Sequence, residues 1–174
     1  MWLTVTSTIL MMSILPIDLA QNPCEQINKG TLKLKGKEAS DLSFYCECNF
    51  DELKVRNAIL SELPSCFEGK KINSLVLENI HPGTFPKGIS ELEDLKLLSF
   101  KSTELAFLPN EVAELPSLRE LDLRGTKISY LPEGLDHLVK IDLRLTELNK
   151  AEQESIRDQY PDIKIYFSSP CNCH

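Results

Sequence analysis

Apolar residues recur along the middle of the chain with a rhythm that neither one helix nor one strand would need. The segment 118–128 reads L-x-x-L-x-L-x-x-T-x-I, and a Leu-Pro pair follows three residues later. The same frame starts at positions 50, 72, 95, 118 and 138, so the copies lie 22, 23, 23 and 20 residues apart. One such unit cannot bury its own apolar edge, so repeats of this size must stack. The pattern therefore predicts a short solenoid whose L-x-L segments form one parallel sheet.

The five copies resemble the leucine-rich repeat family, and the resemblance covers residues 50–167. It implies an α/β solenoid: a short right-handed superhelix with a parallel sheet on its concave face and irregular or 3₁₀ segments on its convex side. Where the family's pattern has an inward Asn, this chain has Ala58, Ile80, Thr103, Thr126 and Thr146. A threonine hydroxyl can pair with buried backbone groups, whereas Ala58 and Ile80 cannot. We therefore expect looser turns in the first two repeats.

Both flanks of the repeats carry local signals of their own. After the last repeat, Asn149 and Glu152 have the spacing of a capping box, which predicts a helix from about 150 to 159 that ends before Pro161. Apolar residues then alternate over 163–167, which predicts one more strand and a helix-and-strand cap. Before the repeats, the alternating segment 31–35 lies between two glycines and predicts a short strand or hairpin arm.

A local basic cluster lies in the segment that precedes the repeats, formed by Lys29, Lys33, Lys35 and Lys37. A heparin-like or membrane-surface role is one interpretation of this cluster. Lysines more commonly guard a solvated edge strand against pairing with another chain, and we favour that interpretation.

Residues 1–20 have the character of a secretory signal peptide. They contain no Lys or Arg, an apolar run spans about 9–17, and a small residue stands at Ala20. An uncleaved membrane anchor or a disordered leader is the alternative, but Pro16 and Asp18 interrupt a run that barely reaches spanning length. No second stretch is long and apolar enough to span a bilayer. The prediction is a secreted, extracellular product divided into a signal peptide (1–20), a cysteine cap (21–49), five repeats (50–148) and a helix-strand cap with a C-x-C tail (149–174).

Cysteine usage agrees with export. The six cysteines form an even number and all lie at the two ends of the predicted solenoid, where disulfides can hold a covering loop. The segment around Cys24, Cys46 and Cys48 is similar to the amino-terminal cap of extracellular leucine-rich repeat proteins, and that resemblance implies the pairs Cys24–Cys48 and Cys46–Cys66.

The last two cysteines, Cys171 and Cys173, remain open in the sequence. They could close a small ring, link two chains in a disulfide-bonded dimer, or reach back to the last repeat. A metal site formed by these two thiols and His174 is less favoured, because one short cluster without a partner half is not a metal signature. No cofactor is predicted.

The net charge argues against nucleic-acid binding, and the motifs argue against catalysis. The formal net charge is −7, which offers no basic footprint for nucleic acid. The three histidines come with no nucleophile and orienting carboxylate, and the chain contains no phosphate loop or nucleophile elbow. We therefore expect a binding protein rather than an enzyme.

The concave face of the predicted sheet carries the candidate binding residues. Alternate residues of each strand face outward and stack about 4.8 Å apart into columns. One column reads Arg56, Glu78, Lys101, Arg124 and Arg144, and the column beside it reads Lys54, Val76, Ser99, Asp122 and Asp142. The candidate site comprises Lys101, Asp122, Arg124, Asp142, Arg144 and Tyr166. These charges could simply pair across strands and solubilise the sheet, or they could meet carboxylates or sulfates of a partner, with Tyr166 as an aromatic anchor.

Three functions follow from these patterns. The favoured one is a secreted module that recognises a protein ligand or receptor on its concave sheet, which is what the family resemblance implies. A structural extracellular matrix component that self-associates through Cys171 or Cys173 is the alternative. An intracellular leucine-rich repeat scaffold, whose leader is not a signal, is the third.

Overall fold

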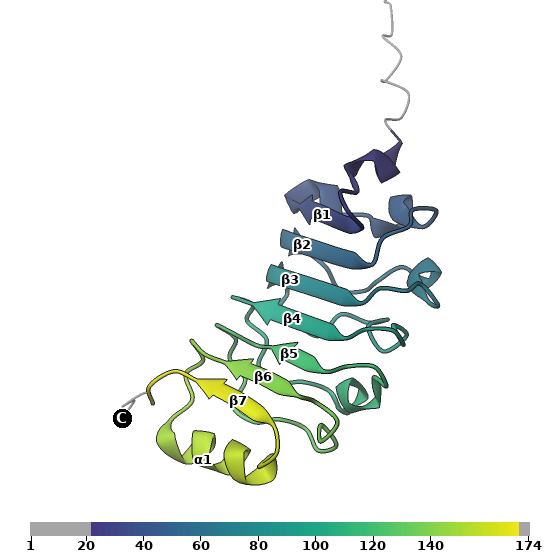
Figure 1. The fold of residues 1–174 in the computed structure, drawn as a ribbon. Helices are drawn as coiled ribbons and strands as arrows, with labels where there is room; N and C mark the ends of the chain where they lie inside the picture. Colours follow the sequence, from purple (N-terminus) through teal and green to yellow (C-terminus); the bar gives the residue numbers. More distant parts are fainter. Residues whose placement is uncertain (1–21, 171–174) are drawn as a thin grey trace, which may run out of the picture.

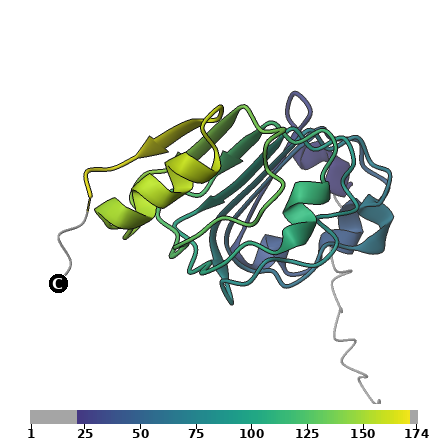
Figure 2. The same cartoon turned by 90° about the horizontal axis from the view of Figure 1, so that it is seen from below.

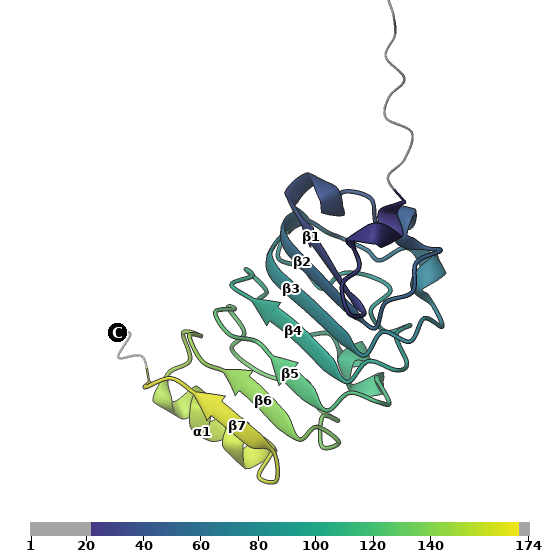
Figure 3. The ribbon, with the colours of Figure 1, turned by 45° about the horizontal axis from the view of Figure 1, so that its top comes forward.

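A computed structural model describes residues 22–170 as one curved sheet of seven parallel strands in the order β1 to β7 (Figure 1). The strands are β1 (Thr31–Lys35), β2 (Glu52–Ile59), β3 (Ser74–His81), β4 (Leu97–Lys101), β5 (Glu120–Asp122), β6 (Lys140–Leu143) and β7 (Lys164–Phe167). Because sequence neighbours are also sheet neighbours, each coil of chain stacks directly on the one before it (Figure 3). The predicted solenoid is confirmed, and β1 adds one coil to the amino-terminal side of the five repeats.

Helical segments connect the strands on the side away from the concave face. Within residues 22–170 they are the 3₁₀ turns η1 (Pro23–Gln26), η2 (Gly36–Ala39), η3 (Leu42–Tyr45), η4 (Ser65–Phe67) and η5 (Asn110–Glu114), and one α-helix, α1 (Lys150–Gln159). The short convex segments match the predicted 3₁₀ or extended connections. None of the helices described for residues 22–170 is long and apolar enough to cross a membrane.

The core is a column of inward side chains that runs through every coil. Leu98 of β4 pairs in register with Leu121 of β5, and Leu121 pairs with Ile141 of β6. The same column continues through the other strands, and its members are at most 1% exposed: Leu32, Leu53, Leu75, Leu98, Leu121 and Ile141. Each buried aliphatic side chain contributes about 1.5–3 kcal/mol. Stacking thus supplies the dry interior that a single repeat lacks.

The carboxy-terminal end is closed by α1 and β7, as the sequence predicts. The Asn149 side chain accepts a hydrogen bond from the Glu152 amide at 3.1 Å, and the Glu152 carboxylate accepts one from the Asn149 amide at 2.7 Å. The helix ends before Pro161, and β7 pairs in parallel with β6. Figure 2 shows α1 alongside β7 at this end of the sheet. Ile156 of α1 is 2% exposed, so the helix covers the apolar edge of the last coil.

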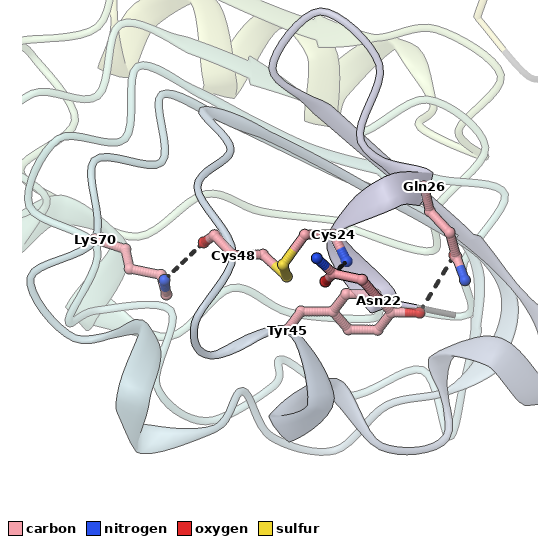
Figure 4. The surroundings of a disulfide bond; sticks show 6 residues. All are labelled: Asn22, Cys24, Gln26, Tyr45, Cys48 and Lys70. Atoms are coloured by element: carbon pink, nitrogen blue, oxygen red, sulfur yellow. Dashed lines mark hydrogen bonds between the residues drawn. A yellow bond between two sulfur atoms is a disulfide. The ribbon is translucent and has the colours of Figure 1, made fainter. Parts of the chain in front are cut away.

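The amino-terminal end carries two disulfides, Cys24–Cys48 and Cys46–Cys66, which is the pairing that the family resemblance implies. Cys48 is 1% exposed, and the Lys70 ammonium group donates a hydrogen bond to its carbonyl at 2.9 Å (Figure 4). Tyr45 also lies in this cap, where its hydroxyl bonds the Gln26 side chain at 3.3 Å. The Cys46–Cys66 disulfide and the hydrogen bond from Lys70 therefore attach the segment before β2 to the first coils. The predictions for residues 1–20 and for the Cys171, Cys173 and His174 tail lie outside the described residues.

The expectation of looser turns in the first two repeats is wrong. Strands β2 and β3 are the longest of the sheet, with eight residues each, and their pairing continues through Ala58 opposite Ile80 and Ile59 opposite His81. The Leu60 amide then donates to the His81 carbonyl at 2.9 Å. The pairing of β2 with β3 satisfies part of the backbone here, and the Ile80 amide donates to the Thr103 hydroxyl of the next coil at 3.4 Å. The two apolar side chains can therefore remain in the core.

The later turns follow the predicted threonine pattern. The Thr126 hydroxyl donates to the Leu123 carbonyl at 2.7 Å, and the Thr146 hydroxyl donates to the Leu143 carbonyl at 2.6 Å. One residue before these threonines, and at the equivalent point of the other coils, the backbone takes a positive φ, which at Asn57 and Asn79 occurs within β2 and β3. The residues with this conformation are Gly36, Asn57, Asn79, Ser102, Gly125 and Leu145. The turn geometry is therefore shared by all these coils, although the side chains that satisfy it differ.

Candidate functional site

The candidate residues gather on the carboxy-terminal half of the concave face. Asp122 is the last residue of β5, and Asp142 stands opposite it in register on β6. Tyr166 of β7 follows in the same row. The three side chains align because the repeats place equivalent positions at the same height of neighbouring coils. Arg124 and Arg144 occupy the outward positions two residues beyond the aspartates, and Lys101 ends β4.

Each aspartate is bound by the arginine of its own coil. Arg124 donates to both carboxylate oxygens of Asp122, each at 2.9 Å, and its backbone amide donates to the same carboxylate at 3.2 Å. Arg144 repeats this arrangement on Asp142, with side-chain distances of 2.9 and 2.6 Å and an amide distance of 3.2 Å. Two-pronged pairs of this kind fix the plane of the guanidinium group. The sequence motif D-x-R thus builds the same rigid unit twice.

Longer contacts join the two units into one network across the strands. The Lys101 ammonium lies 3.4 Å from an Asp122 oxygen, and the Arg124 Nε lies 3.6 Å from an Asp142 oxygen. The charges do pair with one another, but the shorter contacts lie within each coil rather than across strands, where one interpretation of the sequence placed them. We call the set Lys101, Asp122, Arg124, Asp142 and Arg144 the charge ladder.

Alternation along each strand predicts that all these side chains face solvent, but part of the charge ladder is buried. The Asp142 side chain is only 6% exposed because the guanidinium groups of Arg124 and Arg144 lie against it. Ser99, in the same column on β4, is 1% exposed. The Arg124 and Arg144 side chains are 34% and 49% exposed. A partner would therefore meet the arginines and reach the aspartates only through them.

Tyr166 borders the ladder at its carboxy-terminal end. The Arg144 guanidinium carbon lies 5.7 Å from the centre of the Tyr166 ring, and the Lys164 ammonium lies 5.2 Å from it on the same strand. Cations at this distance from an aromatic face are attracted to it. The ring is half-buried. It therefore presents an apolar surface framed by two positive groups.

These side chains line a shallow hollow of about 280 Å³. Four of the five charge-ladder residues and Tyr166 contribute to its wall, whereas Lys101 lies outside it and is connected through Asp122. Sequence reasoning missed two further wall residues, Glu120 and Lys140, which form an ion pair at 2.8 Å. They stand two residues before Asp122 and Asp142, so the same alternation rule applied one step earlier would have found them.

Burial and ion pairing shift the pKa values of the two aspartates in opposite directions. Burial raises the pKa of Asp122, but hydrogen bonds from the Arg124 side chain and amide outweigh it, and the pKa lies below its usual value. The pKa of Asp142 is likewise raised by burial and lowered further by hydrogen bonds from Arg144. Both carboxylates are therefore held in the ionised form, as the acceptors of a fixed network.

Acid should weaken this network before it weakens the apolar core. A carboxyl whose pKa is depressed on folding stabilises the protein above its unfolded pKa, about 3.9, and loses that contribution as the pH falls through its lower folded pKa. Wild type should therefore lose thermal stability below about pH 4, measured as the midpoint of melting by circular dichroism. The Asp122→Asn plus Asp142→Asn variant should show a flatter profile there. Asp94→Asn removes an exposed carboxylate outside the ladder and serves as control; equal profiles for all three proteins would contradict the assignment.

No metal centre emerges from the described part of the chain. Residues 22–170 contain no group of three or more His, Cys, Asp or Glu side chains arranged to hold an ion. His137, on a convex turn, contacts the Gly134 carbonyl at 3.2 Å rather than any nucleophile. The concave face offers fixed charges and hydrogen-bonding groups, and this arrangement suits recognition.

Comparison with known proteins places the fold. No protein-family model and no curated protein matches the sequence. Among solved structures, the Leptospira interrogans LRR protein LIC12759 superposes with a TM-score of 0.52 at 25% identity, over 68% of this chain and 37% of that one. Human 5T4, also named Wnt-activated inhibitory factor 1 or trophoblast glycoprotein, superposes with a TM-score of 0.53 at 19% identity, over 70% of this chain and 52% of that one. This chain therefore spans 37% of the length of the first protein and 52% of the length of the second. With its stacked repeats, parallel sheet and disulfide-bonded end, the chain is a leucine-rich repeat solenoid with a cysteine-containing amino-terminal cap.

Proposed function

We propose that this solenoid is a secreted module that recognises a protein ligand or receptor on the carboxy-terminal half of its concave face. The observation that carries the proposal is the charge ladder with Tyr166 at its end. Its guanidinium groups are held in place before any partner arrives, so binding would cost little side-chain entropy. Arginine and tyrosine are also the side chains most enriched at energetically important interface positions.

The size of the hollow favours a macromolecular partner over a small molecule. Its volume of about 280 Å³ falls below the range of roughly 300–1,000 Å³ usual for small-molecule sites. Its walls carry six charged side chains beside Leu97 and Leu121, and Tyr166 is the only aromatic ring among the described residues that line it. A partner with acidic groups facing Arg124 and Arg144 would gain association rate and orientation from these charges. We therefore infer a contact selected by charge, with the Tyr166 ring as its apolar contribution.

Export is supported by the cap. Two disulfides join the four cysteines among the described residues, and disulfides persist mainly in oxidising compartments. Together with the signal-like character of residues 1–20, this supports release of the mature chain outside the cell. Protein recovered from the medium of expressing cells should then begin at Gln21 when its amino terminus is sequenced.

The test of partner recognition uses that secreted protein as bait. Tyr166→Ser removes the ring from the hollow, and the control Tyr130→Ser removes a tyrosine that is 56% exposed and lies outside the hollow. Baits are incubated with solubilised cell-surface proteins, and bound proteins are quantified by mass spectrometry. A specific partner should be retained by wild type and by the control, and its recovery from Tyr166→Ser should fall about tenfold, as for loss of an interface anchor. Identical recovery by all three baits would remove this surface from consideration.

A further inference from the structure

A second charged region lies at the opposite end of the concave face, on the first two strands. Lys33 of β1 stands in register with Lys54 of β2, and Lys35 stands in register with Arg56. These four side chains line a hollow of about 200 Å³, together with Leu34. We call it the basic hollow. The sequence shows Lys33 and Lys35 within a run of four lysines, but only the parallel pairing of β1 with β2 brings them beside two further cations from the next coil.

Two of the four cations are already paired within the molecule. The Lys54 ammonium lies 3.0 Å from Glu52, and the Arg56 Nε lies 3.0 Å from Glu78. Lys33 and Lys35 are exposed and take part in no ion pair found among residues 22–170. The basic hollow therefore presents two unpaired positive charges on a protein whose formal net charge is −7.

The spacing of these charges is fixed by the strand. Residues two apart on one face of a strand are separated by about 6.6 Å, and the neighbouring strand lies about 4.8 Å away. A lysine ammonium is a compact charge on a flexible stem, which suits a single anionic group rather than the two-pronged contact that an arginine makes. The basic hollow thus fits a ligand that carries separate anionic groups at intervals of a few ångströms.

The surroundings of the basic hollow narrow the class of ligand. A protein interface has an apolar and aromatic centre, but here the only apolar wall residue is Leu34, which is 2% exposed. Peripheral attachment to a bilayer needs apolar side chains that enter the lipid, and none lines the hollow. Nucleic acid binding relies on many phosphate contacts, and only two cations are unpaired here. None of these three arguments applies to a thin, polar chain that carries anionic groups.

We propose that the basic hollow binds sulfate groups of a sulfated glycan, with Lys33 and Lys35 as the principal contacts and Lys54 and Arg56 as supporting charges. Each sulfate ester carries one negative charge, so two sulfates balance the two unpaired ammonium groups. This site is separate from the charge ladder and stands or falls independently of the protein-binding function proposed above.

The experiment measures binding of the full secreted chain to a heparin-derived hexasaccharide by isothermal titration calorimetry. Lys33→Ser plus Lys35→Ser removes the two unpaired cations. The matched control Lys87→Ser plus Lys96→Ser removes two exposed lysines outside β1 and β2, with the same change in net charge. Lys33→Arg plus Lys35→Arg keeps the charge and reports on any loss that comes from folding. Unsulfated hexasaccharide of the same backbone and phosphatidylserine vesicles are the alternative ligands.

The expected result is binding that weakens with added salt and falls about tenfold or more in the Lys33 and Lys35 serine variant. The Lys87 and Lys96 control and the arginine variant should bind as wild type does. Equal loss in the control would show that only net charge matters, and this would overturn the proposal. Equally strong binding of the unsulfated hexasaccharide, or binding to vesicles alone, would overturn it as well.

Discussion

Replacing Phe100 with alanine should destabilise the solenoid by about 3–5 kcal/mol, because a fully buried aromatic side chain leaves a cavity that the coils above and below cannot fill. Phe100 is 0% exposed in β4, and its ring centre lies 5.6 Å from that of Phe85. It is also in register with Leu77 of the preceding coil. The loss should appear as a lower midpoint of unfolding in urea, followed by circular dichroism.

The matched control is Phe44→Ala, since Phe44 belongs to the cap turn η3 and is 69% exposed. This control should shift the unfolding free energy by less than about 0.5 kcal/mol, as surface substitutions usually do. A Phe100→Ala protein that unfolds at the same urea concentration as the control would show that the coils do not share one interior.

Removing the disulfide between the cap and the first coil should have the second largest effect. Cys46 and Cys66 are 20 residues apart in sequence, and a cross-link that closes a loop of this size stabilises a domain by about 3 kcal/mol. Cys46→Ser plus Cys66→Ser should therefore melt at a clearly lower temperature than wild type in calorimetry. The cap should also become the first site of cleavage by a protease, because η3 lies directly before Cys46 and loses this attachment to the first coil.

Reduction of the wild-type protein provides the control for this variant. Under a reducing agent that opens both disulfides, wild type should melt at or below the temperature of the double serine variant. If the serine variant instead melts at the wild-type temperature, the Cys46–Cys66 bond is not a structural element of the cap.

The basic hollow and the charge ladder lie at opposite ends of the concave face and differ in how their charges are paired. In the ladder, both arginines already bind aspartates, so their guanidinium groups are held rigidly, and three cations stand against two carboxylates. In the basic hollow, Lys33 and Lys35 extend from the first strand and are exposed. A partner at the carboxy-terminal half would meet arginines that are already bound to aspartates, whereas an anion at the amino-terminal half would meet Lys33 and Lys35, with Lys54 and Arg56 paired to glutamates beside them. The two ends of the concave face are therefore suited to different ligands.

Local patterns in the sequence were sufficient to predict the stacked coils and the helix α1. The return of Leu98, Leu121 and Ile141 at similar intervals predicts stacked coils, because only stacking can bury their side chains. The capping box of Asn149 and Glu152 predicts the helix, since both hydrogen bonds form within one turn. The disulfide pairing followed from family resemblance, because cysteine spacing alone leaves the connectivity open.

The candidate site was only partly predictable. Alternation along each strand predicts that Asp122, Arg124, Asp142, Arg144 and Tyr166 share one face, and they line one hollow. Alternation cannot say that the arginines turn back onto their own aspartates and bury Asp142, because the direction of a long side chain depends on the charges around it. It also passed over the Glu120–Lys140 pair on the same wall.

Sequence patterns alone predict the five repeats, the direction of their apolar edges and the helix α1, because these depend on residues a few positions apart, but they do not predict that β1 adds a further coil. The register between neighbouring coils is known only from the folded structure. That register places Lys33 beside Lys54 and Lys35 beside Arg56, and it brings the Thr103 hydroxyl of the next coil to the Ile80 amide. Contacts between coils join residues about twenty positions apart, and their geometry is fixed by how the coils pack rather than by any local pattern.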